Sequence, residues 1–407
     1  MKYLDYVNLK YKPSKDDLVV EFYIEPNKVS IKKAAGAVAA ESSTGTWSEV
    51  KTEKKYMKKL SAKVFEIKGN LVKIAYPIDL FEQSSIPNLL SSIAGNIFGM
   101  KIVKNIKLLD ASFPGKYVKG FRGPKFGIKG VRKVLKVKKR PLLGTIIKPK
   151  IGLNPKDHAK VAYEAWLGGC DLVKDDENLA SQKFNIFEKR VLETLKMMEK
   201  AERETGEKKG YIVNITAETH EMVKRAYFVL ENNGNYMMVD ILTVGFSALQ
   251  TLRNQDFNLI LHAHRAGHAA LTRNKKHGIS MLFLAKIARM VGVDQLHTGT
   301  ANVGKMESDE EETIKVNEFL RSKFFGLKKV FPVASGGLHP GSVPRLVNLL
   351  GKDIIIQAGG GIHGHPKGTL YGAKAMREAI EAVVKGYGLE EYSKKHKALE
   401  LALKKWR

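Results

Sequence analysis

Short apolar runs alternate with longer amphipathic segments over the last two thirds of the chain. Each run is rich in Leu, Ile or Val and has the length of one buried strand. Eight such runs are predicted as strands: Leu142–Ile147, Cys170–Val173, Tyr211–Ile215, Tyr236–Val244, Asn258–His262, Asp294–His297, Val330–Ala334 and Asp353–Gln357. Strands that alternate with helices predict a parallel sheet.

The segments between these runs carry apolar residues at helical spacing. The predicted helices are Pro155–Leu167, Phe187–Glu204, His220–Glu231, Met281–Val291, Thr313–Lys323 and Ser342–Leu350, with a less regular one at Phe246–Asn254. Eight strand–helix units over roughly 250 residues match a closed (β/α)8 barrel, the TIM barrel. An open doubly wound sheet is the alternative, but no GxGxxG sequence follows the first strand.

The first 130 or so residues show a different order of elements. The pattern predicts a strand at Leu18–Ile24, a helix at Ser30–Ala40, a hairpin over Ala62–Ala75, a helix within Leu80–Phe98 and a strand at Lys101–Leu109. This order predicts a small α+β domain of the ferredoxin-like kind. We therefore expect an N-terminal α+β domain over residues 1–138 and a catalytic barrel with C-terminal helices over residues 139–407.

The chain is strongly basic, with 69 Lys and Arg against 42 Asp and Glu and a net charge of +27. A nucleic-acid-binding protein and an enzyme that handles anions both fit this charge. The basic residues are spread along the sequence, with a local peak at Lys129–Arg140, and no zinc-finger spacing or RNA-recognition motif is present. We therefore favour the enzyme and expect no nucleic-acid partner.

Location is constrained by three further features. No run of about 18 apolar residues occurs, so no membrane-spanning helix and no membrane partner are expected. The first residues are charged where a signal peptide needs an apolar run. Cys170 is the one cysteine, which excludes a disulfide within the chain and fits a reducing compartment. The sequence predicts a cytoplasmic protein.

In barrel enzymes the active site lies at the carboxyl ends of the strands. Polar, ionisable or glycine residues follow nearly every predicted strand, which packing alone does not require. These residues are Lys148 and Lys150; Lys174, Asp176 and Glu177; Asn214 and Thr216; His262, His264 and Arg265; His297; Ser335, Gly336 and Gly337; and Gly359 and Gly360. The pattern predicts an active site at this end of the barrel.

Asp176 and Glu177 are hard oxygen donors of the kind that Mg²⁺ prefers. A solvated acidic turn is the alternative, but the position after a barrel strand and beside Lys174 favours a metal. Lys148, Lys150 and Lys174 would place three ammonium groups at one mouth, and like charges lower the pKa of a lysine. A neutral lysine can act as a base or nucleophile or can react with CO₂. The alternative is that all three lysines point outward into solvent.

The glycine runs after the seventh and eighth strands expose backbone N–H groups that can hold a phosphate, although they also suit ordinary turns. Arg265 and His297 are candidates for a second anion site, because guanidinium binds anions in a bidentate manner. A lone histidine is more often structural, and His262 and His277 fit that interpretation. Two anion sites beside a metal indicate a bisphosphate substrate.

Several motifs together resemble the large subunit of ribulose-1,5-bisphosphate carboxylase/oxygenase (RuBisCO), most of all the archaeal form III enzymes. The resemblance covers nearly the whole chain. The motifs are GTIIKPKIGL (144–153), GGCDLVKDDEN (168–178), LHAHRAGHAA (261–270), HTGT (297–300), VASGGLHPG (333–341) and IQAGGGIHGHP (356–366), with ESSTGTW (41–47) and AGNIFGMK (94–101) in the N-terminal part.

The resemblance implies Mg²⁺-dependent carboxylation of ribulose-1,5-bisphosphate by CO₂ to two molecules of 3-phosphoglycerate, with a side reaction with O₂. For the archaeal type it further implies a role in recycling the ribose of nucleoside monophosphates. CO₂ would carbamylate Lys174, which would bind Mg²⁺ with Asp176 and Glu177. Lys148 would be an acid and base for the substrate, His264 a proton relay, and Lys305 the cation that polarises CO₂.

The remaining implied roles concern substrate binding and assembly. The substrate-binding residues would be Glu41, Thr46, Trp47, Asn96, Lys150, Arg265, His297, Ser335, Gly336, Gly337, Gly359 and Gly360. Among these, Glu41, Thr46 and Asn96 would come from the neighbouring subunit. The resemblance thus implies a homodimer or a higher homo-oligomer of dimers, with no small subunit.

The chain departs from the plant-type pattern at three places. Ile146 replaces a threonine, Gly267 replaces the usual methionine, and the loop before Lys305 is one residue longer. These differences bear on the choice between CO₂ and O₂ and on closure of the loop, and not on the reaction class. The main alternative function is that of a RuBisCO-like enolase or isomerase of sulfur salvage. Such relatives replace several catalytic residues, all of which are present in this chain.

Overall fold

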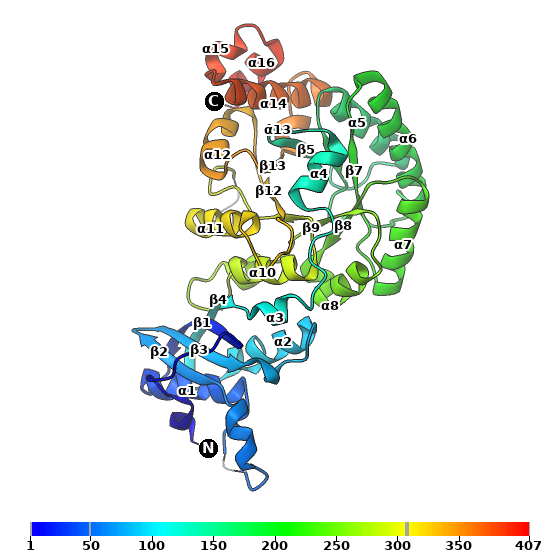
Figure 1. Cartoon of the computed structure of the whole chain (residues 1–407). Helices are drawn as coiled ribbons and strands as arrows, with labels where there is room; N and C mark the ends of the chain where they lie inside the picture. The colour runs from blue at the N-terminus through cyan, green and yellow to red at the C-terminus, as the bar shows by residue number, and fades with distance from the viewer. Residues whose placement is uncertain (1, 49, 306–308, 407) are drawn as a thin grey trace. The chain divides into compact units, whose positions relative to one another are not determined.

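The computed structural model describes residues 2–48, 50–305 and 309–406 (Figure 1). The chain divides into two compact units. The smaller unit comprises the residues up to Arg122 together with Gly267–Val291 and Phe324–Gly326. The barrel unit comprises Gly123–Ala266, Gly292–Lys323 and the residues from Leu327 to the C-terminus.

The smaller unit is built on one mixed sheet with the strand order β10-β4-β1-β3-β2. Its strands are β1 (Asp17–Pro26), β2 (Lys63–Lys68), β3 (Leu71–Pro77), β4 (Val103–Ser112) and β10 (Gly278–Ile279). Its helices are α1 (Ile31–Glu41), α2 (Ile86–Ile93), α3 (Gly115–Val118), α9 (Ala269–Thr272) and α10 (Met281–Val291), with 3₁₀ turns at Tyr3–Tyr6, Lys55–Leu60, Ile78–Leu80 and Asn96–Gly99. Central strand β1 runs antiparallel to β3 and β4, which confirms the predicted α+β unit.

In the barrel unit, eight parallel strands of the described chain close into a barrel, as predicted. The strands are β5 (Leu142–Ile146), β6 (Leu172–Lys174), β7 (Gly210–Asn214), β8 (Tyr236–Asp240), β9 (Ile260–His264), β11 (Gln295–His297), β12 (Phe331–Ser335) and β13 (Ile355–Gln357). β13 pairs with β5 and completes the ring. Their residues are buried almost throughout, because in a barrel one face packs inside and the other lies under helices.

Helices surround this barrel (Figure 1). They are α4 (Gly127–Leu135), α5 (Pro155–Leu167), α6 (Phe187–Thr205), α7 (Thr219–Glu231), α8 (Ile241–Asn254), α11 (Glu310–Arg321), α12 (Val343–Leu350), α13 (Gly360–His363), α14 (Gly368–Lys385), α15 (Leu389–Ser393) and α16 (Lys397–Lys405), with a 3₁₀ turn at Pro340–Ser342. Helix α5 begins where the sequence indicates, since the Asn154 side chain accepts a hydrogen bond from the Asp157 backbone at its N-terminus.

Helix α4 closes the amino-terminal end of the barrel. It overlaps the basic segment Lys129–Arg140, in which we expected a domain boundary, and its apolar face consists of Ile128, Val131 and Leu135. These residues pack in one cluster with the first residues of several strands, among them Leu142, Leu172, Tyr236, Ile260, Phe331 and Ile355. The barrel unit thus includes this helix, and the domain boundary after residue 138 stays a prediction.

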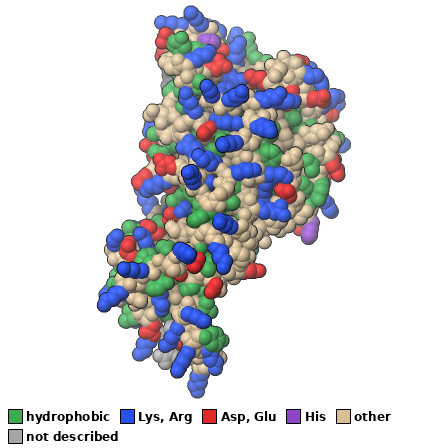
Figure 2. All heavy atoms as spheres, viewed as in Figure 1, with side chains coloured by type: hydrophobic (Ala, Val, Ile, Leu, Met, Phe, Trp, Pro, Cys, Tyr) green, Lys and Arg blue, Asp and Glu red, His purple; other side chains and the backbone are tan. Residues whose placement is uncertain are grey.

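Lys and Arg side chains are scattered over the visible face of the molecule, with acidic side chains between them (Figure 2). They do not gather in one stripe on that face. No helix within the described ranges has both the length and the hydropathy needed to cross a bilayer.

Candidate active site

Four strand ends bring predicted catalytic and substrate-binding side chains to one mouth of the barrel. Lys174 is the last residue of β6, His264 of β9 and His297 of β11, while Lys148 follows β5. Because the strands are parallel, their carboxyl ends open on the same side. The end opposite to this mouth is the one that α4 closes.

The predicted metal ligands form the centre of a charged cluster. Lys148 Nζ donates to Asp176 Oδ2 at 2.7 Å, and Lys174 Nζ donates to Glu177 Oε2 at 3.2 Å. Lys150 Nζ lies 4.0 Å from Glu177 Oε1 and is more exposed. The three lysines therefore face the two carboxylates, which excludes the alternative that all three point outward.

Lys174 is fully buried, and burial lowers the pKa of its ammonium group. The nearby carboxylates of Glu177 and Asp176 act in the opposite direction. We expected crowding of like charges to lower this pKa. The cause found is loss of hydration, because a buried amine loses the water that stabilises its charged form.

Glu177 has a pKa of about 2. Partial burial alone would raise this pKa, but the charges of Lys174 and His264 outweigh burial and favour the carboxylate. Glu177 is therefore an anionic oxygen donor over the whole physiological range.

His264 lies against Glu177 and against a residue that sequence reasoning missed, Asp240. Its Nε2 is 3.7 Å from Glu177 Oε2, and its Nδ1 is 3.5 Å from Asp240 Oδ1. The backbone N–H of Ala266 donates to both Nδ1 of His264 and Oδ1 of Asp240. Nδ1 is thus an acceptor, which places the proton of a neutral ring on Nε2, toward the carboxylate.

His297 is held by His262, which the sequence indicated as a structural histidine, together with Gln295, which sequence reasoning missed. The Oε1 of Gln295 lies 2.7 Å from His262 Nδ1, so this nitrogen carries the proton and His262 Nε2 is an acceptor. His297 Nε2, 2.9 Å away, then donates to His262 and leaves its own Nδ1 for other contacts. Burial lowers the pKa of His262 to about 3 and that of His297 well below its usual value.

Arg265 follows β9 directly. Burial lowers the pKa of its guanidinium to about 10, so Arg265 remains charged at neutral pH. The carboxylate of Glu312 acts in the opposite direction on this pKa through its charge. A partly buried guanidinium at the barrel mouth suits an anionic ligand.

The glycine loops also lie close to this centre. A Cβ on Gly359 would come within 3.1 Å of Lys148 Cε. Lys305 donates its backbone N–H to Gly336 at 3.2 Å, and its side chain lies exposed against Gly337. Ser335 ends β12 beside these glycines, and Gly360 begins α13. The structure thus brings Lys305, Ser335 and both glycine pairs to the barrel mouth.

The four N-terminal candidates belong to the smaller unit. Asn96 donates to Glu41 at 3.3 Å, and both line an open cavity of about 490 Å³ together with Trp47. Trp47 is 84% exposed, which is unusual for a tryptophan and typical of a contact surface. Thr46 is half-buried, and no described contact links it to this cavity. The supply of Glu41, Thr46 and Asn96 to a neighbouring subunit stays a prediction.

Comparison with known proteins assigns the family. A model described as the ribulose bisphosphate carboxylase large chain, catalytic domain, matches residues 127–406, and the corresponding N-terminal domain matches residues 5–117. The chain belongs to the RuBisCO large-chain family. The similar proteins include archaeal enzymes, as the resemblance to the archaeal type implied.

The ribulose bisphosphate carboxylase of Methanocaldococcus jannaschii is 52% identical over 99% of this chain and 100% of the relative. That of Pyrococcus abyssi is also 52% identical, over 99% and 96%. Among solved structures, the octameric RuBisCO of Pyrococcus horikoshii, crystallised with sulfate, has a TM-score of 0.96 at 51% identity and covers 100% of this chain and 97% of that one. The dimeric RuBisCO of Hyperthermus butylicus reaches 0.93 at 46% identity, over 99% of both chains. The chain is therefore an enzyme of the ribulose bisphosphate carboxylase type.

The donor set fits the metal that this family implies. Among the residues described, no three His, Cys, Asp or Glu side chains are arranged to hold a metal ion. This is expected if the third ligand is Lys174, because lysine becomes an anionic oxygen ligand only after its amine adds CO₂. Two carboxylates and one carbamate would supply the hard oxygen ligands that Mg²⁺ prefers.

Proposed function

We propose that this chain catalyses the Mg²⁺-dependent carboxylation of ribulose-1,5-bisphosphate by CO₂ to two molecules of 3-phosphoglycerate, with O₂ as a competing substrate. The observation that supports this most directly is the position of Lys174. It is fully buried, its pKa is lowered, and its Nζ lies 3.2 Å from Glu177, beside Asp176.

Carbamylation of Lys174 would activate the enzyme. The lone pair of its neutral amine would attack the carbon of CO₂, a C–N bond would form as one C=O π bond opens onto its oxygen, and the nitrogen would lose a proton. Burial favours the neutral amine that this step needs. The product is an anion at the end of β6, and Lys174, Asp176 and Glu177 would then hold Mg²⁺. When bound, the ion supplies positive charge that stabilises the developing enediolate.

The side chains around this centre perform the proton transfers. The Lys174 carbamate would remove the proton from C3 of the substrate, with His264 as the relay at the Glu177 side. Lys148, 2.7 Å from Asp176, would later protonate C2 of the cleaved product. Lys305 would place its charge beside CO₂ as it adds to the enediolate.

Two anion-binding regions would fix the bisphosphate. Arg265 and His297 would bind one phosphate, since Arg265 carries its charge next to the end of β9 and the contact of His297 with His262 uses Nε2 and not Nδ1. The other phosphate would lie at the backbone N–H groups of Gly336, Gly337, Gly359 and Gly360, with Thr46 of the neighbouring subunit. Ser335 and Lys150 would contact the central part of the substrate.

We further propose that the protein works as a homodimer or as a homo-oligomer of dimers, without small subunits. The dimeric and octameric assemblies of the similar solved structures support this. Sedimentation velocity of the purified protein would give the assembly directly. A monomer at micromolar concentration would contradict a site shared between subunits.

The reaction itself is tested with ribulose-1,5-bisphosphate, Mg²⁺ and ¹⁴C-labelled CO₂. Labelled 3-phosphoglycerate is expected from the wild type and none from Lys174→Met. Without labelled product, the carboxylase proposal fails, and an enolised or isomerised product from a sulfur-salvage substrate would establish the alternative function. A role in nucleoside monophosphate recycling predicts that label from the ribose of AMP reaches 3-phosphoglycerate in cell extract only when this enzyme is present.

A further inference from the structure

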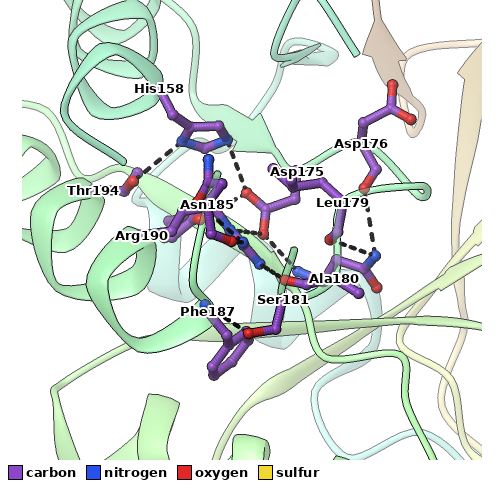
Figure 3. Close-up of polar contacts among 12 residues, drawn as sticks. His158, Asp175, Asp176, Leu179, Ala180, Ser181, Asn185, Phe187, Arg190 and Thr194 are labelled. Carbon is purple, nitrogen blue, oxygen red and sulfur yellow. Dashed lines mark hydrogen bonds and ion pairs between the residues drawn. The ribbon is translucent and has the colours of Figure 1, made fainter. Parts of the chain in front are cut away.

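Asp175 lies between two predicted metal ligands in sequence, but its side chain points the other way. Side chains alternate between the two faces of a strand. Positions 172, 174 and 176 therefore face the barrel interior, and position 175 faces the surrounding helices. Figure 3 shows the Asp175 carboxylate turned toward His158 and Arg190, whereas the Asp176 carboxylate points away from them. Asp175 is completely buried.

Four groups from three elements surround this carboxylate. Oδ1 accepts from the Tyr211 hydroxyl at 2.6 Å and lies 3.2 Å from His158 Nε2. Oδ2 accepts from Arg190 Nε at 3.2 Å and from the backbone N–H of Asn214 at 3.0 Å. The carboxylate is therefore fixed to α5, α6 and β7 at once.

Arg190 extends this connection to the loop that follows the metal ligands. Its Nη2 donates to the carbonyl oxygen of Ala180 at 2.8 Å, and its Nη1 donates to Asn185 at 3.3 Å (Figure 3). The same guanidinium thus holds Asp175 before this loop and Ala180 and Asn185 within it.

Asn214 ties the metal-ligand segment from the other side. Its side-chain amide donates to the carbonyl oxygens of Glu177 at 3.1 Å and Leu179 at 3.0 Å, and lies 3.4 Å from that of Asp176. Asn214 ends β7 and is fully buried. One residue therefore binds Asp175 through its backbone and the following turn through its side chain.

We propose that Asp175 and Asn214 are positioning residues of the metal site, which hold the turn from Lys174 to Glu177 in its ligating shape. The inference rests on the proposed function, because it takes Lys174, Asp176 and Glu177 as the metal ligands. Lys174 Nζ itself donates to the carbonyl oxygen of Asp175 at 2.8 Å, so the anchored backbone also orients the amine. Ligand geometry must hold to within about 0.5 Å for tight binding.

The primary test is Asp175→Asn, which keeps the shape and removes the charge. Mg²⁺ binding is measured by calorimetric titration in saturating bicarbonate, and the Lys174 carbamate by NMR with ¹³CO₂. Residues that orient metal ligands change affinity by about 10–100-fold when replaced. We expect a Mg²⁺ dissociation constant raised by that factor and a weaker carbamate signal at the same CO₂ concentration.

Asp171→Asn is the matched control. Asp171 lies just before the other end of β6, is equally buried, and pairs with Arg140 through two contacts of 2.6 Å. Its loss should lower the unfolding temperature and leave the Mg²⁺ dissociation constant within about twofold, because it touches no ligand. If both variants weaken Mg²⁺ binding equally, Asp175 serves general stability and the inference is wrong.

The double variant Asp175→Asn/Arg190→Gln separates position from charge, because it restores a neutral pair. If Asp175 positions the turn, Mg²⁺ binding stays weak; if wild-type affinity returns, charge was the cause and the inference is wrong. Should Asp175→Asn fail to fold, Asn214→Ala removes only the side-chain donors and is expected to weaken Mg²⁺ binding by itself. A wild type that binds no Mg²⁺ in bicarbonate would refute the proposed function instead.

Discussion

Lys148 Nζ lies 2.7 Å from Asp176 Oδ2, so a predicted acid–base group and a predicted metal ligand share one hydrogen bond. Lys148 is partly exposed and Asp176 is buried. The ammonium group therefore offsets the charge of a buried carboxylate, whose other oxygen accepts from the backbone N–H of Asn178 at 3.2 Å. Binding of Mg²⁺ would bring a second cation to the same oxygens, which sets Lys148 in competition with the metal.

Replacing Lys148 by Met should separate metal binding from catalysis. We expect an unchanged or tighter Mg²⁺ dissociation constant, because the competing charge is gone, and a fall in carboxylation of about 10²–10⁴-fold, as for other lost acid–base groups. Lys156→Met, at an exposed position of α5, is the control. Loss of Mg²⁺ binding in Lys148→Met would show that Lys148 supports the ligands instead.

His262 predicts a pH-dependent stability. Its pKa is about 3 in the folded chain, mainly because of burial, against about 6.5 when unfolded. The unfolded state takes up a proton first as the pH falls, so the stabilisation present above pH 6.5 decreases toward pH 3. At pH 5 the loss is about 2 kcal/mol, or 1.5 pH units at 1.36 kcal/mol each. In unfolding experiments from pH 7.5 to 5, His262→Gln should lose less stability than the wild type.

Helix α4 predicts a stability effect remote from the site. Leu135→Ala would leave a cavity against the barrel strands and lower the free energy of unfolding by about 2–5 kcal/mol. Lys133→Ala on the exposed side of the same helix should change it little. Mg²⁺ affinity of the folded variant should equal that of the wild type, and an altered affinity would mean that the two barrel ends are coupled.

A site shared between subunits predicts complementation. Asn96→Asp and Lys174→Met should each be inactive alone, because each spoils every site of its homodimer. After unfolding and refolding an equal mixture, half of the dimers are mixed and each has one intact site, so about a quarter of wild-type activity should return. If no activity returns, Asn96 and Lys174 of one site come from the same subunit, and the shared site is wrong.

The barrel could be predicted because its strands are short apolar runs separated by helices of clear periodicity. The predicted helix at Pro155–Leu167 agrees with α5 at both ends, where an asparagine N-cap and a glycine supply start and stop signals. Helix α4 was missed because its segment is dominated by lysine and arginine. Only its apolar positions, Ile128, Val131 and Leu135, carry the helical signal.

The site was predicted from the residues that follow each strand. A residue was therefore missed where the end of a strand was placed wrongly. The fourth apolar run was drawn from Tyr236 to Val244, whereas β8 ends at Asp240 and α8 begins at Ile241 without an intervening turn. The strand end was therefore overlooked, and Asp240 with it. The roles of Asp175 and Gln295 could not be predicted, because they depend on contacts with α6 and with His262 that only the folded chain brings together.

Strand β6 has three residues and a buried carboxylate beyond each end, Asp171 on one side and Asp175 on the other. A slip of the strand by one position would turn Lys174 outward and Val173 inward. Such a slip would also pull both carboxylates from their arginines and leave charges buried without partners, at a cost of several kcal/mol each. Each pair by itself penalises such a slip, so the register of this short strand is secured at both ends and survives the loss of either pair.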